Sequence, residues 1–118
     1  MNRTIRTARL ADLLLWLIGR RQRIRVAGYS MTPSLRPGQE VFVNRKAYYH
    51  LKPQEGDVVT ARHPYRTDII LIKRIYRVLD DEHILLKGDN PEESTDCRSF
   101  GSIDKKHILG RVVCMLPD

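Results

Sequence analysis

Two residues of this chain, Ser30 and Lys73, are of types that can act together as a nucleophile and a base. Ser30 stands in the segment 28–38, where an apolar run ends in small residues and a turn rich in proline and glycine. Such a bend can present a hydroxyl at a strand end with its main-chain N–H pointing outward, as a nucleophile and an oxyanion donor require. Taken alone, the stretch could equally be an ordinary glycine-serine turn.

Lys73 lies in the run 69–75, which is apolar on both faces up to the lysine. A strand of this kind is typical of burial on both sides. Burial disfavours the charged ammonium and lowers the pKa of a lysine, and a neutral amine could accept the serine proton. Because a strand lysine can also extend its ammonium to solvent, this residue by itself leaves the chemistry open.

A third stretch, 88–101, begins with turn residues and contains Asp96 and Arg98. It predicts a loop held in shape by a carboxylate and a guanidinium, although a surface loop with one ordinary ion pair would have the same composition. The sequence predicts no metal site and no cofactor, because the four histidines lack the spacing of metal ligands. They are His50, His63, His83 and His107.

The positive charge is concentrated at one end of the chain. The formal net charge is +7, and residues 1–25 hold seven arginines and one aspartate. A basic groove across the rest of the chain is therefore disfavoured, and no nucleic-acid partner is predicted. The alternative from another functional class is a basic β-barrel that binds nucleic acid, which would need stacking aromatics, yet aromatics are only 7% of the residues.

Cysteine content and hydropathy indicate in which cellular compartment the protein is expected. Cys97 and Cys114 are too few for a disulfide framework and favour a reducing compartment, so we expect a cytoplasmic protein. The apolar run 13–18 is far shorter than the roughly 20 residues that span a bilayer. Arginines follow it where a signal peptide would have its cleavage site. The sequence therefore predicts neither a membrane span nor a signal peptide.

One helix and a set of short strands must position these residues. Leucines at i, i+3, i+4 and i+7 predict an amphipathic helix that ends near Gly19. Its apolar face could pack on the domain's own core or on a second subunit. With Trp16 and the flanking arginines, the helix could instead lie on an anionic membrane or dock a partner.

After Arg23 the pattern changes to short β-branched runs separated by proline and glycine, which predicts a mainly β fold with one N-terminal helix. We expect residues 1–23 to form a basic N-terminal segment that contains the helix, and residues 24–118 to form the β domain. The predicted strands are 24–27, 40–44, 57–62, 68–78, 83–87 and 108–116.

In this order, the three stretches resemble the Ser-Lys endopeptidases of the type I signal peptidase family. The pattern is Ser-Met-x-Pro-x-Leu-x-x-Gly, then Lys-Arg at the end of an apolar strand, then Gly-Asp-Asn-x-x-x-Ser-x-Asp-x-Arg-x-Phe-Gly. The resemblance covers about residues 24–113. It implies the signal-peptidase-like β fold, which the self-cleaving repressor proteases also resemble.

The resemblance makes Ser30 the nucleophile and Lys73 the general base. The hydroxyl of Ser94 would orient the lysine amine, and Asp96 and Arg98 would be the pair that braces the loop behind the site.

One oxyanion donor would be the main-chain N–H of Ser30. Many family members have a serine two residues before the nucleophile as a second donor, whereas this chain has Gly28, so Tyr29 or an ordered water could fill that role. In the family the substrate lies extended between the strand entering the serine and the strand carrying the lysine. The residues expected to bind substrate are Ile24, Val26, Gly28, Tyr29, Met31, Ile70 and Ile72.

Within the family, the chain is similar to nickel-type superoxide dismutase maturation proteases. The similarity lies in its short length, the lack of an anchor, the segment 61–66, and the segments 94–96 and 100–101. It implies removal of the leader of a nickel superoxide dismutase precursor; the alternative is signal-peptidase-like processing of other precursors. The expected contacts with a membrane surface are Leu10, Leu13, Leu14, Trp16 and Leu17.

Overall fold

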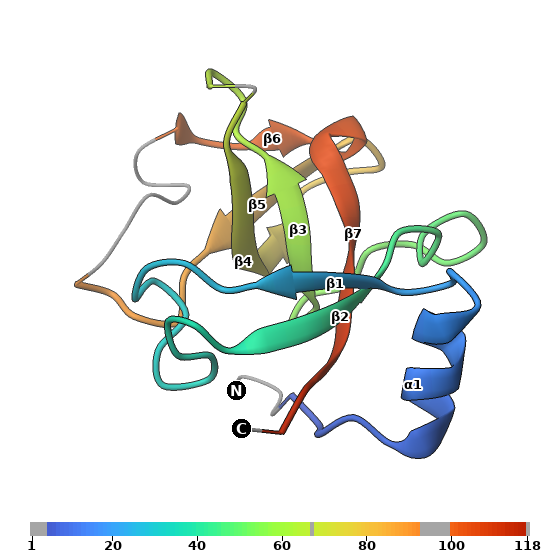
Figure 1. Ribbon diagram of the computed structural model, residues 1–118. Helices are drawn as coiled ribbons and strands as arrows, with labels where there is room; N and C mark the ends of the chain where they lie inside the picture. The colour runs from blue at the N-terminus through green and yellow to red at the C-terminus, as the bar shows by residue number, and fades with distance from the viewer. Residues whose placement is uncertain (1–4, 67, 93–99, 118) are drawn as a thin grey trace.

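The computed structural model describes residues 5–66, 68–92 and 100–117. Within these ranges seven strands form one antiparallel sheet in the order β1-β2-β7-β3-β4-β5-β6, which curls so that β1 and β2 run across β7 (Figure 1). The predicted fold class, mainly β with one short N-terminal helix, is confirmed. The elements are α1 Leu10–Leu17, β1 Gln22–Arg25, β2 Glu40–Asn44, β3 Val58–Arg62, β4 Ile70–Val78, β5 His83–Lys87, β6 Ile103–Asp104, η1 Lys105–His107 and β7 Ile108–Met115.

Most strand boundaries follow the apolar pattern. The predictions for β2 and β5 coincide with the structure, and those for β3, β4 and β7 differ by one or two residues at an end. β1 begins two residues before its predicted start and ends at Arg25, because its pairing with β2, from Gln22 opposite Val43 to Arg25 opposite Glu40, decides where the ladder runs. β6 was not predicted, since two residues are too few to show an alternation.

The sheet is buried on both faces where β3 crosses the centre of the fold. Val58 belongs to a core cluster with Val26, Met31 and Leu35, whereas its neighbour Val59 belongs to a second cluster. Successive side chains of a strand point to opposite faces, so β3 separates the two clusters. The second cluster comprises Val59, Ala61, Ile75, Ile84, Leu86, Phe100 and Ile103.

The helix α1 turns its polar residue inward. Asp12 is only 4% exposed, and Arg6 donates two hydrogen bonds to its carboxylate, at 2.7 and 2.8 Å. The main-chain N–H of Arg9 donates a third, at 2.7 Å, which satisfies a donor at the start of the helix. The guanidinium of Arg6 holds the pKa of Asp12 well below its usual range.

Trp16 also faces the domain, which corrects the expectation that it lies with the leucines toward a membrane. Its ring stacks on that of Phe42, with the centroids 5.8 Å apart, and the guanidinium of Arg23 lies 5.3 Å from its centre. Asp12 and Trp16 are four residues apart and therefore share a helix face. The opposite face carries exposed leucines: Leu10, Leu13, Leu14 and Leu17.

Among the described residues, no helix combines the length and the hydropathy needed to cross a membrane. The division of the chain at residues 23 and 24 stays a prediction.

Candidate functional site

Ser30 lies in the bend that follows β1, and core residues hold the bend on both sides. Val26, Met31 and Leu35 are buried in the first core cluster, and Gly28 has a φ of +76°, which glycine adopts without strain. Ser30 itself is half-buried. Within the part of the chain that the structure describes, neither its hydroxyl nor its main-chain N–H has a hydrogen-bond partner.

Lys73 lies in the middle of β4 and is only 3% exposed, which confirms the buried position expected from the apolar run around it. It pairs with Val59 of β3, and it shares a face of β4 with Ile75, two residues further on. Val59 and Ile75 both belong to the second core cluster. The Lys73 side chain is therefore on the side of the sheet where that apolar cluster lies.

Gly88 connects Lys73 with Ser30. The last pair of β4 and β5 is Arg74 with Lys87, and continuing that register by one step would set Gly88 opposite Lys73. Side chains directly opposite each other share a face of the sheet. On that face, a Cβ placed on Gly88 would lie 2.5 Å from the carbonyl oxygen of Ser30 and 3.3 Å from its Cβ. Ser30 therefore packs against the main chain of Gly88 on the Lys73 side.

Asn90 fixes the Ser30 bend through three hydrogen bonds. Its main-chain N–H donates to the carbonyl oxygen of Ser30 at 2.9 Å. Its side-chain Nδ2 donates to the carbonyl oxygen of Tyr29 at 3.2 Å and to the hydroxyl of Thr32 at 3.0 Å. The bend is thus attached to the loop after β5 at the serine and on both sides of it.

Arg74 and Asp89 form a buried ion pair beneath this attachment. Arg74 donates from Nε and Nη2 to both carboxylate oxygens of Asp89, each at 2.9 Å, and from Nη1 to the carbonyl oxygen of Gly56 at 2.8 Å. The hydroxyl of Ser34 donates to Asp89 at 2.6 Å. Both charged side chains are almost fully buried, and bidentate pairs of this kind are the geometrically specific ones.

This ion pair was not predicted from the sequence, although both residues stand in the motifs described above. Arg74 directly follows Lys73, and Asp89 is the second residue of Gly-Asp-Asn. Two features of the sequence could have indicated it. One is a cation directly after a lysine in an apolar strand, and the other is an aspartate between glycine and asparagine. The sequence indicated a brace only for Asp96 and Arg98, which lie outside the described residues.

Three predicted site residues lie outside the described residues: Ser94, Asp96 and Arg98. Their predicted roles, orienting the lysine and bracing the loop, stay predictions.

The residues expected to bind substrate fall into two groups. Val26 and Met31 are buried in the core, so a substrate could meet them only through their main chain. Tyr29 and Ile70 are exposed, and Gly28 lies in the bend beside Ser30. Ile24 and Ile72 are partly buried against the first core cluster.

β1 is an edge of the sheet, and an edge strand can pair with an extended peptide.

In the described ranges, no three His, Cys, Asp or Glu side chains lie close enough to hold a metal ion. Cys114 is buried, and burial raises the pKa of its thiol, which keeps it protonated. Cys97 lies outside the described residues.

Comparison with known proteins gives a family match over this region. The family described as "Signal peptidase, peptidase S26" matches residues 4–78, which include Ser30 and Lys73. The mitochondrial inner membrane protease subunit 1 of Xenopus tropicalis is 25% identical over 105 residues, and these cover 73% of this chain and 63% of that protein.

Two further relatives extend the comparison to plants and bacteria. The mitochondrial ATP-independent inner membrane protease subunit 1b of Arabidopsis thaliana is 30% identical over 108 residues, covering 73% of this chain and 64% of that protein. Signal peptidase IB of Staphylococcus aureus is 36% identical over 64 residues, covering 54% of this chain and 33% of its own length. The matches thus span less than two thirds of the length of these relatives.

Proposed function

Because the chain belongs to the peptidase S26 signal peptidase family, we propose that it is a serine endopeptidase that removes the N-terminal leader of a precursor protein. Ser30 is the nucleophile and Lys73 is the general base. The observation that carries the proposal is the packing of Ser30 against Gly88, on the face of the sheet to which the buried Lys73 belongs.

The reaction is acyl transfer at a peptide bond. Neutral Lys73 accepts the proton of the Ser30 hydroxyl as its Oγ attacks the scissile carbonyl. The main-chain N–H of Ser30, which has no acceptor among the described residues, donates to the oxyanion. The Lys73 ammonium then gives its proton to the leaving amine. Water next attacks the acyl-enzyme while Lys73 accepts its proton, and Lys73 returns that proton to the Ser30 oxygen as the carboxylic acid product leaves.

Burial is what suits Lys73 to this role. An amine held out of water is less stable as an ammonium than it is in solvent, so burial favours the neutral form that can accept a proton. The residues that hold the serine bend, Asn90 and the Arg74 and Asp89 pair, act through position alone. In this mechanism Ser94 orients the lysine amine.

For the precursor, we place a nickel-type superoxide dismutase first, because the segments 61–66 and 100–101 resemble the proteases that mature it. The similarity to inner membrane proteases and to signal peptidase IB favours the alternative, in which the chain processes other precursors. The cytoplasmic location expected from the two cysteines belongs to the first of these proposals.

The test is cleavage of purified precursors by the full chain. One substrate is a nickel superoxide dismutase precursor and the other is a precursor with a secretory leader, and mass measurement of the products identifies each new N-terminus. We expect a single cut that separates leader from mature chain. Ser30→Ala and Lys73→Met should each abolish the cut, because they remove the nucleophile and the base while keeping the approximate size of the side chain.

Two control variants separate chemistry from folding. Ser102→Ala changes an exposed serine outside the site, and Thr60→Val removes a buried hydroxyl that has no hydrogen-bond partner among the described residues. Both should cleave at the wild-type rate. Undiminished turnover by Ser30→Ala or by Lys73→Met would overturn the dyad, and failure on one precursor with cleavage of the other would decide the substrate.

A further inference from the structure

The outer face of α1 presents apolar side chains to solvent. Leu10 is 71% exposed and Leu17 is 70% exposed, and Ile18, the residue that follows the helix, is 68% exposed. Leu13 and Leu14 are exposed on the same face. A contiguous exposed apolar patch of this kind marks an interaction site more often than a plain surface. We call these five residues the leucine face.

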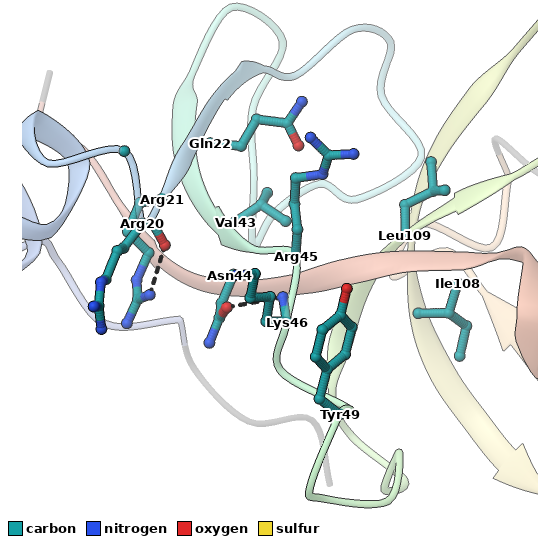
Figure 2. A pocket seen from close by; sticks show the side chains of 11 residues that line it. Arg20, Arg21, Gln22, Val43, Asn44, Arg45, Lys46, Tyr49, Ile108 and Leu109 are labelled. Carbon is teal, nitrogen blue, oxygen red and sulfur yellow. Dashed lines mark hydrogen bonds between the residues drawn. The ribbon is translucent and has the colours of Figure 1, made fainter.

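A basic hollow begins where the leucine face ends. Its volume is about 990 Å³, and it is lined by the chain after α1, the end of β2 and the start of β7. Figure 2 shows Arg20 and Arg21 at one end, Ile108 and Leu109 at the other, and Tyr49 between Lys46 and Ile108. Four of its lining residues are cations and none is an acid: the cations are Arg20, Arg21, Arg45 and Lys46.

These cations form no close ion pair with a carboxylate among the described residues: none of the four has a carboxylate within 4 Å. Arg21 donates from Nη1 to the carbonyl oxygen of Arg20, and its buried Nε has no acceptor among the described residues. By contrast, the neighbouring Arg23 pairs with Glu40. The charge of Arg21 also helps to lower the pKa of Asp12, so the unneutralised positive charge of the hollow comes from Arg20, Arg45 and Lys46. This charge favours an anion.

The leucine face and the hollow are continuous along the chain. Leu17 and Ile18 are followed directly by Gly19 and Arg20, the first residues that line the hollow. Apolar side chains next to cations match the two parts of a phospholipid at a bilayer surface, because the leucines can enter the acyl boundary while the cations meet the phosphates. A nucleic acid would use the cations and leave the leucines in water.

We propose that the leucine face and the basic hollow together bind the surface of a bilayer containing anionic phospholipid, with a headgroup phosphate in the hollow. The surface lies at the Gln22 end of β1, whereas the bend with Ser30 follows the other end of that strand. Binding there leaves the candidate catalytic site open to substrate. The proposal is independent of the proposed peptidase activity.

The test measures sedimentation of the full chain with lipid vesicles. One set contains equal amounts of phosphatidylglycerol and phosphatidylcholine, and the other contains phosphatidylcholine alone. We expect binding to the anionic set only, weakening as salt is added. The double variant Arg45→Ala with Lys46→Ala should weaken binding to the anionic vesicles by about fivefold for each cation removed. The matched control, Arg66→Ala with Arg77→Ala, removes the same charge from exposed positions between β3 and β4 and on β4.

A second pair of variants tests the apolar half. Leu14→Ser with Leu17→Ser alters exposed side chains and so should leave the fold and any cleavage of soluble precursor unchanged, while it lowers vesicle binding at least tenfold. Equal binding to both vesicle sets, or no effect of either double variant, would overturn the proposal. The proposal would also be overturned if inorganic phosphate inhibited vesicle binding while Leu14→Ser with Leu17→Ser had no effect. The hollow would then be a site for free phosphate. Preferential binding of a single-stranded RNA would identify a nucleic-acid surface instead.

Discussion

The carbonyl oxygen of Ser30 lies over the main chain of Gly88 so closely that a Cβ on Gly88 would come within 2.5 Å of it. No rotamer change can relieve such a contact, because one of the two groups is backbone. The approach is possible only with glycine at this position. It joins the bend that carries the candidate nucleophile to the loop after β5, which begins directly after the pair of Lys87 with Arg74, the neighbour of the buried lysine.

Replacing this glycine should therefore displace the serine. In Gly88→Ala the new methyl group must push the Ser30 bend away by about 1 Å, and a misplacement of this size lowers kcat/KM by roughly 100-fold. Overpacking should also lower the free energy of unfolding by about 1–3 kcal/mol. Kinetics on a cleavable precursor and denaturant unfolding measure the two effects.

The control for this substitution is Glu92→Ala, an exposed position in the same loop. It should retain wild-type kcat/KM. Full activity in Gly88→Ala would mean that the contact does not set the position of the serine.

The pH dependence of cleavage should report the lysine. If neutral Lys73 is the base, kcat/KM rises with pH as the amine loses its proton, and burial moves this limb well below the ordinary lysine pKa of about 10.4. The measurement is kcat/KM across pH with a substrate that has no group titrating in that range. If kcat/KM instead rose with an apparent pKa close to that of an ordinary lysine, the base would be a solvated amine. That result would contradict the assignment of buried Lys73 as the general base.

The buried pair of Arg74 and Asp89 should dominate the stability of this end of the sheet. Asp89→Asn leaves the guanidinium buried without a counter-charge, so we expect the free energy of unfolding to fall by about 3–5 kcal/mol. Chemical denaturation measures it. Combining Arg74→Met with Asp89→Leu removes both charges and should recover most of the loss. If the single and double variants were equally unstable, lost packing would explain the effect better than an unpaired charge.

Acid stability should depend on Asp12. Arg6 holds the pKa of this carboxyl below its ordinary value, so the unfolded chain takes up the proton first as the pH falls. The pair therefore stabilises the fold fully above about pH 5, and its contribution disappears progressively as the pH falls further. Asp12→Asn should lower the free energy of unfolding by about 1–3 kcal/mol at pH 7.

The difference between Asp12→Asn and the wild type should shrink below about pH 5. Thermal unfolding of both proteins at several pH values checks this, with Asp81→Asn, a highly exposed carboxylate, as the control. A constant difference down to pH 2 would show that the carboxylate has an ordinary pKa in the folded state.

The sequence by itself determined the mainly β class, the helix and most strand positions, and it predicted a buried strand around Lys73. These features depend on local patterns: alternation, helical spacing and the length of an apolar run decide which segments can form and bury strands or helices. The motif around Ser30 also indicated the family, since residue types and their spacing are readable without coordinates.

Only the tertiary structure decided how these parts face one another. The leucine periodicity predicts a helix but not its orientation, and the structure places Asp12 and Trp16 against the domain because Arg6 and Phe42 are there to receive them. The contact of Ser30 with Gly88 and the ion pair of Arg74 with Asp89 join residues far apart in sequence. Such contacts depend on the register and curl of the whole sheet, which no local stretch of the chain encodes.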